Sequence, residues 1–166
     1  MNDATMKPDK QDIVVDDVFP HAPEVIWKLL TNGELISRWL MKATGFAAVE
    51  GTRFTLQTTP AGAWDGVIHC QVLEVIPNER LVYSWKGGHE GNVGYGSKLE
   101  TIVTFTLSKV EDGTRLRLVH SGFVLPKNET AFTNMGQGWK KVVRSLDDIA
   151  AEQEPSKPSP KSKPKS

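Results

Sequence analysis

The chain of 166 residues is poor in cysteine, in long apolar runs and in any excess of charge. Its single cysteine, Cys70, excludes an intramolecular disulfide and is typical of a reducing compartment, so we expect a cytoplasmic location. No run of about 18 apolar residues is present, so no membrane span is expected, and the polar N-terminus has no apolar core of the kind found in signal peptides. Twenty Lys and Arg balance twenty Asp and Glu, so no overall field indicates nucleic acid as a partner.

Motifs for metals, phosphates and nucleophilic catalysis are missing as well. The four histidines have no ligand spacing, and no metal is expected. The glycine-rich stretch 87–97 lacks the Gly-Lys-Ser/Thr ending of a phosphate loop, so we expect a mobile lid or a plain hairpin loop there. Cys70 lies on the apolar face of a predicted strand, where burial makes a thiol inert. The sequence therefore predicts no catalytic residue and no cofactor.

Both ends of the chain differ in composition from its middle. Residues 1–11 are polar, and residues 153–166 form a Lys/Pro/Ser tract, so both are predicted to be disordered. The last ten residues carry four lysines but no aromatic side chains on which nucleic-acid bases could stack. Residues 12–152 are predicted to form one domain.

Alternation of apolar and polar residues dominates the middle of the chain. Residues 13–19 predict a first strand, and residues 65–85 predict a hairpin whose turn lies at Pro77-Asn78. Residues 99–120 predict a second hairpin around a Glu-Asp-Gly turn. Glu74 falls on the apolar face of its strand, which predicts a β-bulge or an ionic partner for this carboxylate.

Helical spacing appears in three places. Residues 23–31 and 34–40 predict two short helices, and the final helix is expected to open at Gly138-Trp139. The order is thus one strand, two short helices, a meander that brings the sheet to about six or seven strands, and one long helix. This order predicts an α+β fold.

Five short motifs follow one another along the chain: PEVIW at 23–27, GTRF at 51–54, VLEVIP at 72–77, RLVYSW at 80–85, and HSGF at 120–123. This order resembles the START-like (SRPBCC) helix-grip superfamily, in the AHSA-type branch named after the activator of the heat-shock chaperone ATPase. The resemblance implies a curved antiparallel sheet that wraps around the C-terminal helix and encloses a hydrophobic cavity. Relatives include carriers of lipids, sterols and hormones, polyketide cyclases and the co-chaperone domain itself, so the fold does not settle the function.

The cavity implied by this resemblance is expected to be lined mainly by apolar and aromatic side chains from several elements. His120 continues the inward parity of Leu118 and would be a polar handle for a ligand. The alternative is a core histidine bonded to a backbone carbonyl or to Ser121. The predicted ligand-binding residues are Trp39, Phe54, Trp64, Trp85, Phe105, Leu118, His120, Met135, Trp139 and Val143.

Three functions follow from the sequence and the resemblance. The leading hypothesis is non-enzymatic binding of a small hydrophobic or aromatic molecule, lipids included, by a monomer or weak dimer. The second is a co-chaperone-like domain that contacts a heat-shock chaperone through its outer sheet surface, as part of a stress response. The third is a polyketide cyclase-type enzyme that uses His120, with Glu74 or Tyr83, as acid and base groups.

Overall fold

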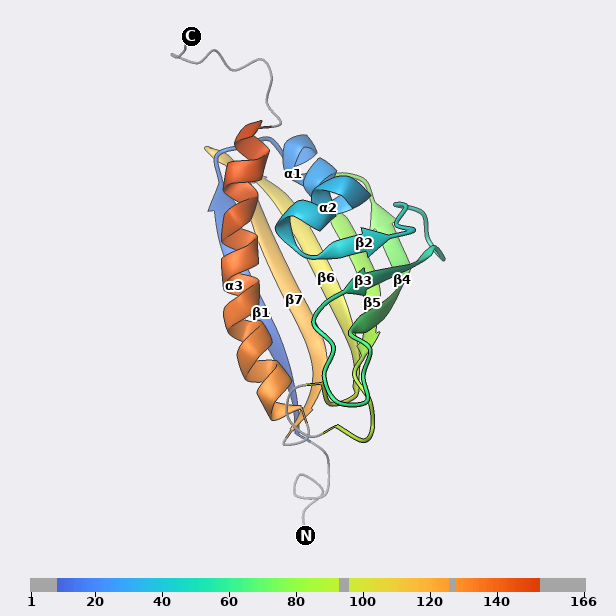
Figure 1. Cartoon of the computed structure of the whole chain (residues 1–166). Coiled ribbons are helices and arrows are strands. Elements are labelled where there is room, and N and C mark those ends of the chain that lie inside the picture. Colours follow the sequence, from blue (N-terminus) through green and yellow to red (C-terminus); the bar gives the residue numbers. More distant parts are fainter. Residues whose placement is uncertain (1–8, 93–95, 126–127, 153–166) are drawn as a thin grey trace.

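The computed structural model describes residues 9–92, 96–125 and 128–152, and shows one antiparallel sheet of seven strands with three helices (Figure 1). The strands follow the order β1-β7-β6-β5-β4-β3-β2 across the sheet. The predicted α+β helix-grip fold is confirmed. The strands and helices, in chain order, are β1 (Asp9–Phe19), α1 (Pro23–Thr31), α2 (Gly33–Trp39), β2 (Lys42–Thr44), β3 (Arg53–Gln57), β4 (Val67–Ile76), β5 (Arg80–Gly87), β6 (Leu99–Val110), β7 (Gly113–Leu125) and α3 (Glu129–Glu152).

The sheet is curved, and its helices share one side of it. α3 runs alongside β1 and β7 on the inner side of the sheet, while α1 and α2 cover one end (Figure 1). Inward side chains of the strands meet these helices in a single hydrophobic core. The helix therefore lies in the grip of the sheet, and any cavity between them is enclosed by α3, the inner strands and the loops at the other end.

The two short helices form for local reasons. Pro23 occupies the first turn of α1, where its missing N–H costs nothing, and Glu24 lies near the positive end of the helix dipole. α1 ends at Asn32, whose side chain then caps α2 by accepting a hydrogen bond from the Leu35 N–H at 3.1 Å. One residue thus closes one helix and opens the next.

The predicted turns and the predicted irregularity at Glu74 are confirmed. Asn78 adopts a φ of 64° in the turn between β4 and β5. The pairing of these strands shifts between Val72 and Glu74, so a β-bulge turns the Glu74 carboxylate away from the core. On the outer side it accepts a hydrogen bond from Arg80 Nε at 2.7 Å.

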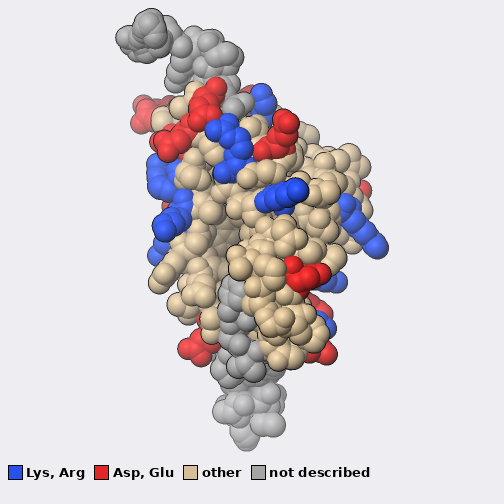
Figure 2. Space-filling model, in the orientation of Figure 1, with Lys and Arg blue, Asp and Glu red and all other residues tan. Residues whose placement is uncertain are grey.

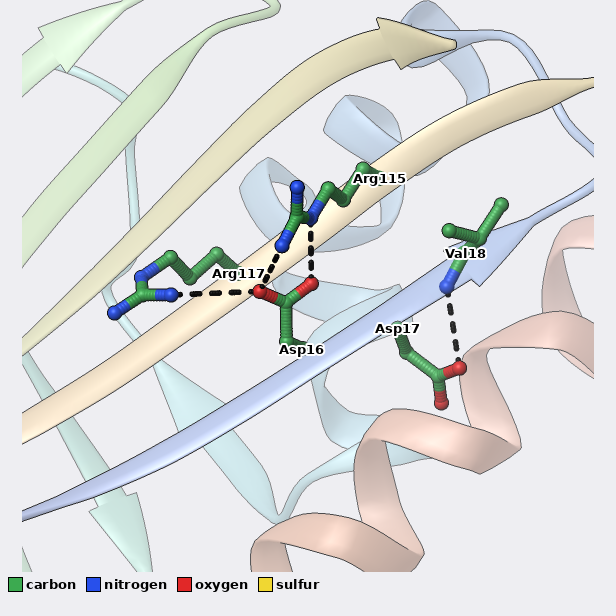
Figure 3. Close-up of polar contacts among 5 residues, drawn as sticks. All are labelled: Asp16, Asp17, Val18, Arg115 and Arg117. Atoms are coloured by element: carbon green, nitrogen blue, oxygen red, sulfur yellow. Dashed lines mark hydrogen bonds and ion pairs between the residues drawn. The ribbon is translucent and has the colours of Figure 1, made fainter. Parts of the chain in front are cut away.

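Two neighbouring aspartates of β1 tie this edge strand to different parts of the fold (Figure 3). Asp16 points to β7, where its carboxylate accepts two hydrogen bonds of 2.7 Å from Arg115 and one of 3.4 Å from Arg117. The Arg115 hydrogen bond is the main reason that the pKa of Asp16 lies below its usual range. Asp17 points the other way and forms an ion pair of 2.6 Å with Arg144 of α3.

The structure corrects the predicted start of the final helix. α3 begins at Glu129, nine residues before Gly138, so Gly136 and Gly138 lie inside the helix and do not open it. Glycine lowers helix propensity by roughly 1 kcal/mol relative to alanine, and two of them in three residues concealed the first turns of the helix. Of the ends predicted to be disordered, residues 1–8 and 153–166 lie outside the described residues, whereas residues 9–11 form the start of β1 and pair with β7.

Candidate functional site

Two adjoining cavities lie between the sheet and α3. The first, which we call the loop cavity, has a volume of about 120 Å³ and reaches the loops that follow β3 and β5. The second, the helix cavity, has a volume of about 190 Å³ and lies along the middle of α3. Seen from the side of α3, the middle of this face carries mostly uncharged residues, while many of the charged side chains gather toward the top and the edges (Figure 2).

One face of α3 forms a wall of both cavities. The residues of this wall recur at intervals of three and four, which places them on a single helical stripe. Opposite them, Ile68, Trp85 and Leu99 of β4, β5 and β6 point inward to the loop cavity. The helical stripe consists of Ala131, Asn134, Met135, Gly138, Trp139 and Val142.

The chemistry of both linings is apolar with a few neutral polar groups. None of the described residues that line either cavity has a side chain that is charged at neutral pH. Thr58, Ser97 and Asn134 supply the polar side chains. The two cavities share four residues, Met41, Trp85, Asn134 and Met135, so they are neighbours with a common wall.

The loops around the loop cavity are braced by asparagine side chains. Asn92 donates a hydrogen bond of 2.7 Å to the Ala61 carbonyl and accepts one of 3.2 Å from the Ala63 N–H. Asn128 donates to the Lys98 carbonyl at 2.9 Å. The glycine-rich stretch 87–97 was expected to be a lid or a hairpin loop; its described part joins β5 to β6 and is tied to the loop before β4, while residues 93–95 lie outside the described residues.

His120 is the centre of a buried chain of hydrogen bonds. Trp139 Nε1 can only donate, so His120 Nδ1 accepts its hydrogen bond, at 2.9 Å. His120 Nε2 therefore carries the proton of the neutral ring and donates it to Thr101 Oγ1 at 2.7 Å. Thr101 Oγ1 in turn donates to the Trp85 carbonyl at 3.0 Å. Both ring nitrogens are thus satisfied by protein groups.

Burial determines the protonation state of this histidine. The side chain is fully buried, and desolvation lowers the pKa of His120 to about 3 from an ordinary value of 6.5. The ring is neutral at physiological pH and packs against aromatic neighbours, with centroids 5.0 Å from Trp85 and 4.7 Å from Phe123. His120 therefore fixes the positions of Trp139 and Trp85, which line the cavities.

The structure brings four of the ten predicted ligand-binding residues to the cavities. Trp64 lines the loop cavity, Trp139 lines the helix cavity, and Trp85 and Met135 line both. The other six are buried in the core and line neither cavity. These six are Trp39, Phe54, Phe105, Leu118, His120 and Val143.

Other lining residues were missed by the sequence analysis. Asn134 and Ala131 lie on the same stripe of α3 as Trp139, nearer to the start of the helix. A helix predicted to begin at Glu129 would have included both. Met41 and Thr58 lie in loop and turn segments, where no periodicity indicates the direction of a side chain. Only the folded chain places them opposite α3.

The acid and base groups considered for an enzyme do not converge. Glu74 lies on the outer side of the sheet with Arg80, and the Tyr83 hydroxyl lies inside, where burial raises its pKa well above the usual range. Burial likewise raises the pKa of the Cys70 thiol to about 12. Among the residues that the structure describes, no three His, Cys, Asp or Glu side chains are grouped to hold a metal ion. The described helices include none long and apolar enough to cross a membrane.

With this geometry established, comparison with known proteins identifies the family. The model of the family described as "Activator of Hsp90 ATPase homolog 1-like protein" matches residues 20–151. The chain belongs to this family. The resemblance inferred from the sequence motifs is thereby confirmed, and the matched range holds every residue that lines the two cavities.

Solved structures of similar proteins share the fold. Protein MLL2253 from Mesorhizobium loti is 34% identical, with a TM-score of 0.74 over 87% of this chain and 98% of that protein. Protein BH1534 from Bacillus halodurans is 25% identical, with a TM-score of 0.67 over 84% of this chain and 96% of that protein. CalU16 from Micromonospora echinospora is 24% identical, with a TM-score of 0.65 over 87% of this chain and 78% of that protein, and shows the fold alone. None of the curated proteins compared with the chain matches it.

Proposed function

We propose that the protein binds a small, uncharged, hydrophobic or aromatic molecule in the cavities between the sheet and α3, without transforming it. The observation that carries this proposal is the lining: among the described residues it has three tryptophans, two methionines and a few neutral polar groups, and no charged side chain. Small-molecule sites have this composition, since apolar walls supply affinity and a few polar groups supply orientation. The loop cavity is close in size to a cavity of about 150 Å³ that holds benzene, so a single aromatic ring fits it.

The inward position of His120 on its strand predicted that this residue contacts the ligand, but in this proposal it has a different role. Both of its nitrogens bond to protein groups, so we assign it to positioning Trp139 and Trp85. The tryptophan rings contact the ligand in place of His120, because they offer flat faces for stacking.

A titration of single-ring and two-ring neutral compounds, followed by tryptophan fluorescence, tests the proposal. Saturable quenching is expected in the native protein. Ala131→Phe fills the loop cavity and should weaken binding at least tenfold, whereas Ala151→Phe, on an exposed part of the same helix, should leave it unchanged. A flat response of the native protein across phenol, indole and 2-naphthol would refute the proposal.

A co-chaperone-like function is the second candidate, favoured by the family and by one surface. The outer side of the sheet exposes Val14, Val18 and Ile102, each more than 40% accessible to solvent. Titrating the protein into the cognate Hsp90-type chaperone, with Ile102→Asp as the variant, separates this role from ligand binding. Association that is lost in Ile102→Asp would support it, and no association would remove it.

A cyclase-type activity has less support from the geometry, because Glu74 lies on the opposite side of the sheet from His120 and Tyr83. For the cell, we propose a cytoplasmic monomer or weak dimer. The location rests on composition, since the one cysteine of the chain, Cys70, is free and buried.

A further inference from the structure

The wall between the two cavities is made of side chains with unequal freedom to move. Trp85, which lines both cavities, is held in the core by its ring contacts with His120 and Trp139. Met41 and Met135, which also line both, are only partly buried. Methionine has an unbranched chain with three rotatable bonds and adapts easily to new packing. The movable part of the wall is therefore the pair of methionines.

Neither cavity is large enough for a typical ligand by itself. The volumes of about 120 Å³ and about 190 Å³ both fall below the roughly 300 to 1,000 Å³ of most small-molecule sites. Joined, the two cavities just reach the lower end of that range. A rotation of Met41 and Met135 is the change that would join them.

Asn134 is the polar group best placed to hold a ligand in such a joined space. Its side chain lines both cavities, is exposed, and makes no hydrogen bond to another residue within the described part of the chain. Its amide offers one acceptor and two donors. Because none of the described residues that line the cavities is charged, a charged ligand would lose its hydration without gaining a counter-ion from them.

We propose that the two cavities are halves of one channel, divided by Met41 and Met135, and that the channel takes an uncharged, flat, two-ring molecule whose hydroxyl or carbonyl group bonds to Asn134. This inference rests on the proposed function, of which it names the ligand class. The ligand displaces the methionine side chains, and each ring occupies one half. Trp64 then contacts one end of the ligand, and Trp139 contacts the other.

The indole N–H signals of these two tryptophans in ¹⁵N-correlated NMR spectra test the channel, with 2-naphthol as the probe. Each signal is assigned by a Trp→Phe variant. We expect 2-naphthol to shift the signals of Trp64 and Trp139 together, with one dissociation constant, because a single molecule touches both. Shifts confined to one signal, or two different dissociation constants, would overturn the channel and leave the proposed function standing. No shift of any indole signal would refute the proposed function itself.

Variants of Met135, in the wall between the cavities, and of Asn134, the polar group, sharpen the test. Met135→Ile keeps the apolar character but stiffens the wall. It should therefore lower the affinity for 2-naphthol at least tenfold and change the affinity for phenol less than twofold. Equal effects on both probes would overturn the partition. Asn134→Leu should weaken 2-naphthol but not naphthalene, whereas Gln137→Leu, exposed on α3 and outside both linings, should affect neither. The anion 2-naphthoate should bind at least tenfold more weakly than 2-naphthol; equal affinity would overturn the assignment of an uncharged ligand.

Discussion

At the scale of single residues, the chemistry of His120 is determined by its surroundings. The imidazole accepts from Trp139 and donates to Thr101, so the fold selects one tautomer of the neutral ring. Protonation would put a donor where Trp139 already donates, and would bury a charge without a counter-ion. The residue type that most often serves as an acid or base near neutral pH is here a structural group.

His120 makes the stability of the protein depend on pH in a defined window. Its pKa is near 6.5 in the unfolded chain and about 3 in the folded one, so between these values only the unfolded chain binds the proton. The free energy of unfolding should therefore fall as the pH is lowered from 6.5 toward 3, by up to about 1.4 kcal/mol per pH unit, and should not depend on this group above 6.5.

Urea denaturation at several pH values measures this contribution. His120→Gln retains a hydrogen-bond acceptor and donor but does not titrate, so its stability should decline less steeply over this window. The matched control is His69→Gln at an exposed position, which should follow the native protein. Parallel slopes for His120→Gln and the native protein would contradict the assignment.

At the scale of elements, α3 combines a wall of the cavities with a weak helical sequence. Gly136 and Gly138 lie in its interior, and an added Cβ at either position would have no heavy atom within 4 Å apart from the helix itself and chain neighbours. Neither glycine is therefore needed for close packing. Only Gly138 lines a cavity, the helix cavity.

Replacing these glycines separates stability from binding. Gly136→Ala should raise the free energy of unfolding by about 0.5–1 kcal/mol, because alanine loses less backbone entropy in a helix. Gly138→Ala should stabilise the helix similarly, but it should also narrow the helix cavity and lower the affinity for 2-naphthol. Urea denaturation and the titration of each variant measure the two effects. Stabilisation by neither variant would show that the helix interior is already rigid.

The elements also show where sequence reasoning succeeds. The hairpin turn at Pro77-Asn78 and the bulge at Glu74 follow from local rules of turn chemistry and of charge on an apolar face, and both are confirmed. The start of α3 was placed wrongly because helix propensity is a weak signal that packing overrides. Local rules thus identify most elements and fail where tertiary contacts decide.

At the scale of the whole molecule, the same limit applies to the site. Inward parity correctly brings Trp85 and Trp139 toward the space between sheet and helix, yet parity gives equal weight to Phe105 and Leu118, which pack solidly. Whether an inward side chain meets a neighbour or a void depends on the curvature of the sheet and the position of α3. Neither is encoded in a single segment.

The molecule should unfold as one unit. A single hydrophobic cluster spans sheet and helices, and β1 pairs with β7 across most of the sequence, so no part has a separate core. Urea transitions followed by tryptophan fluorescence and by far-UV circular dichroism should coincide, and refolding should take milliseconds to seconds because its strand pairings are non-local. Separate midpoints would indicate that α3 or β1 detaches first.

The chain of hydrogen bonds from Trp139 through His120 to Thr101 joins α3, β7 and β6 inside the core. The protons of this chain have no route to solvent while these elements remain packed. Their exchange for deuterium therefore requires the molecule to open. The exchange rate of the His120 Nε2 proton therefore reports how often sheet and helix separate in water without denaturant.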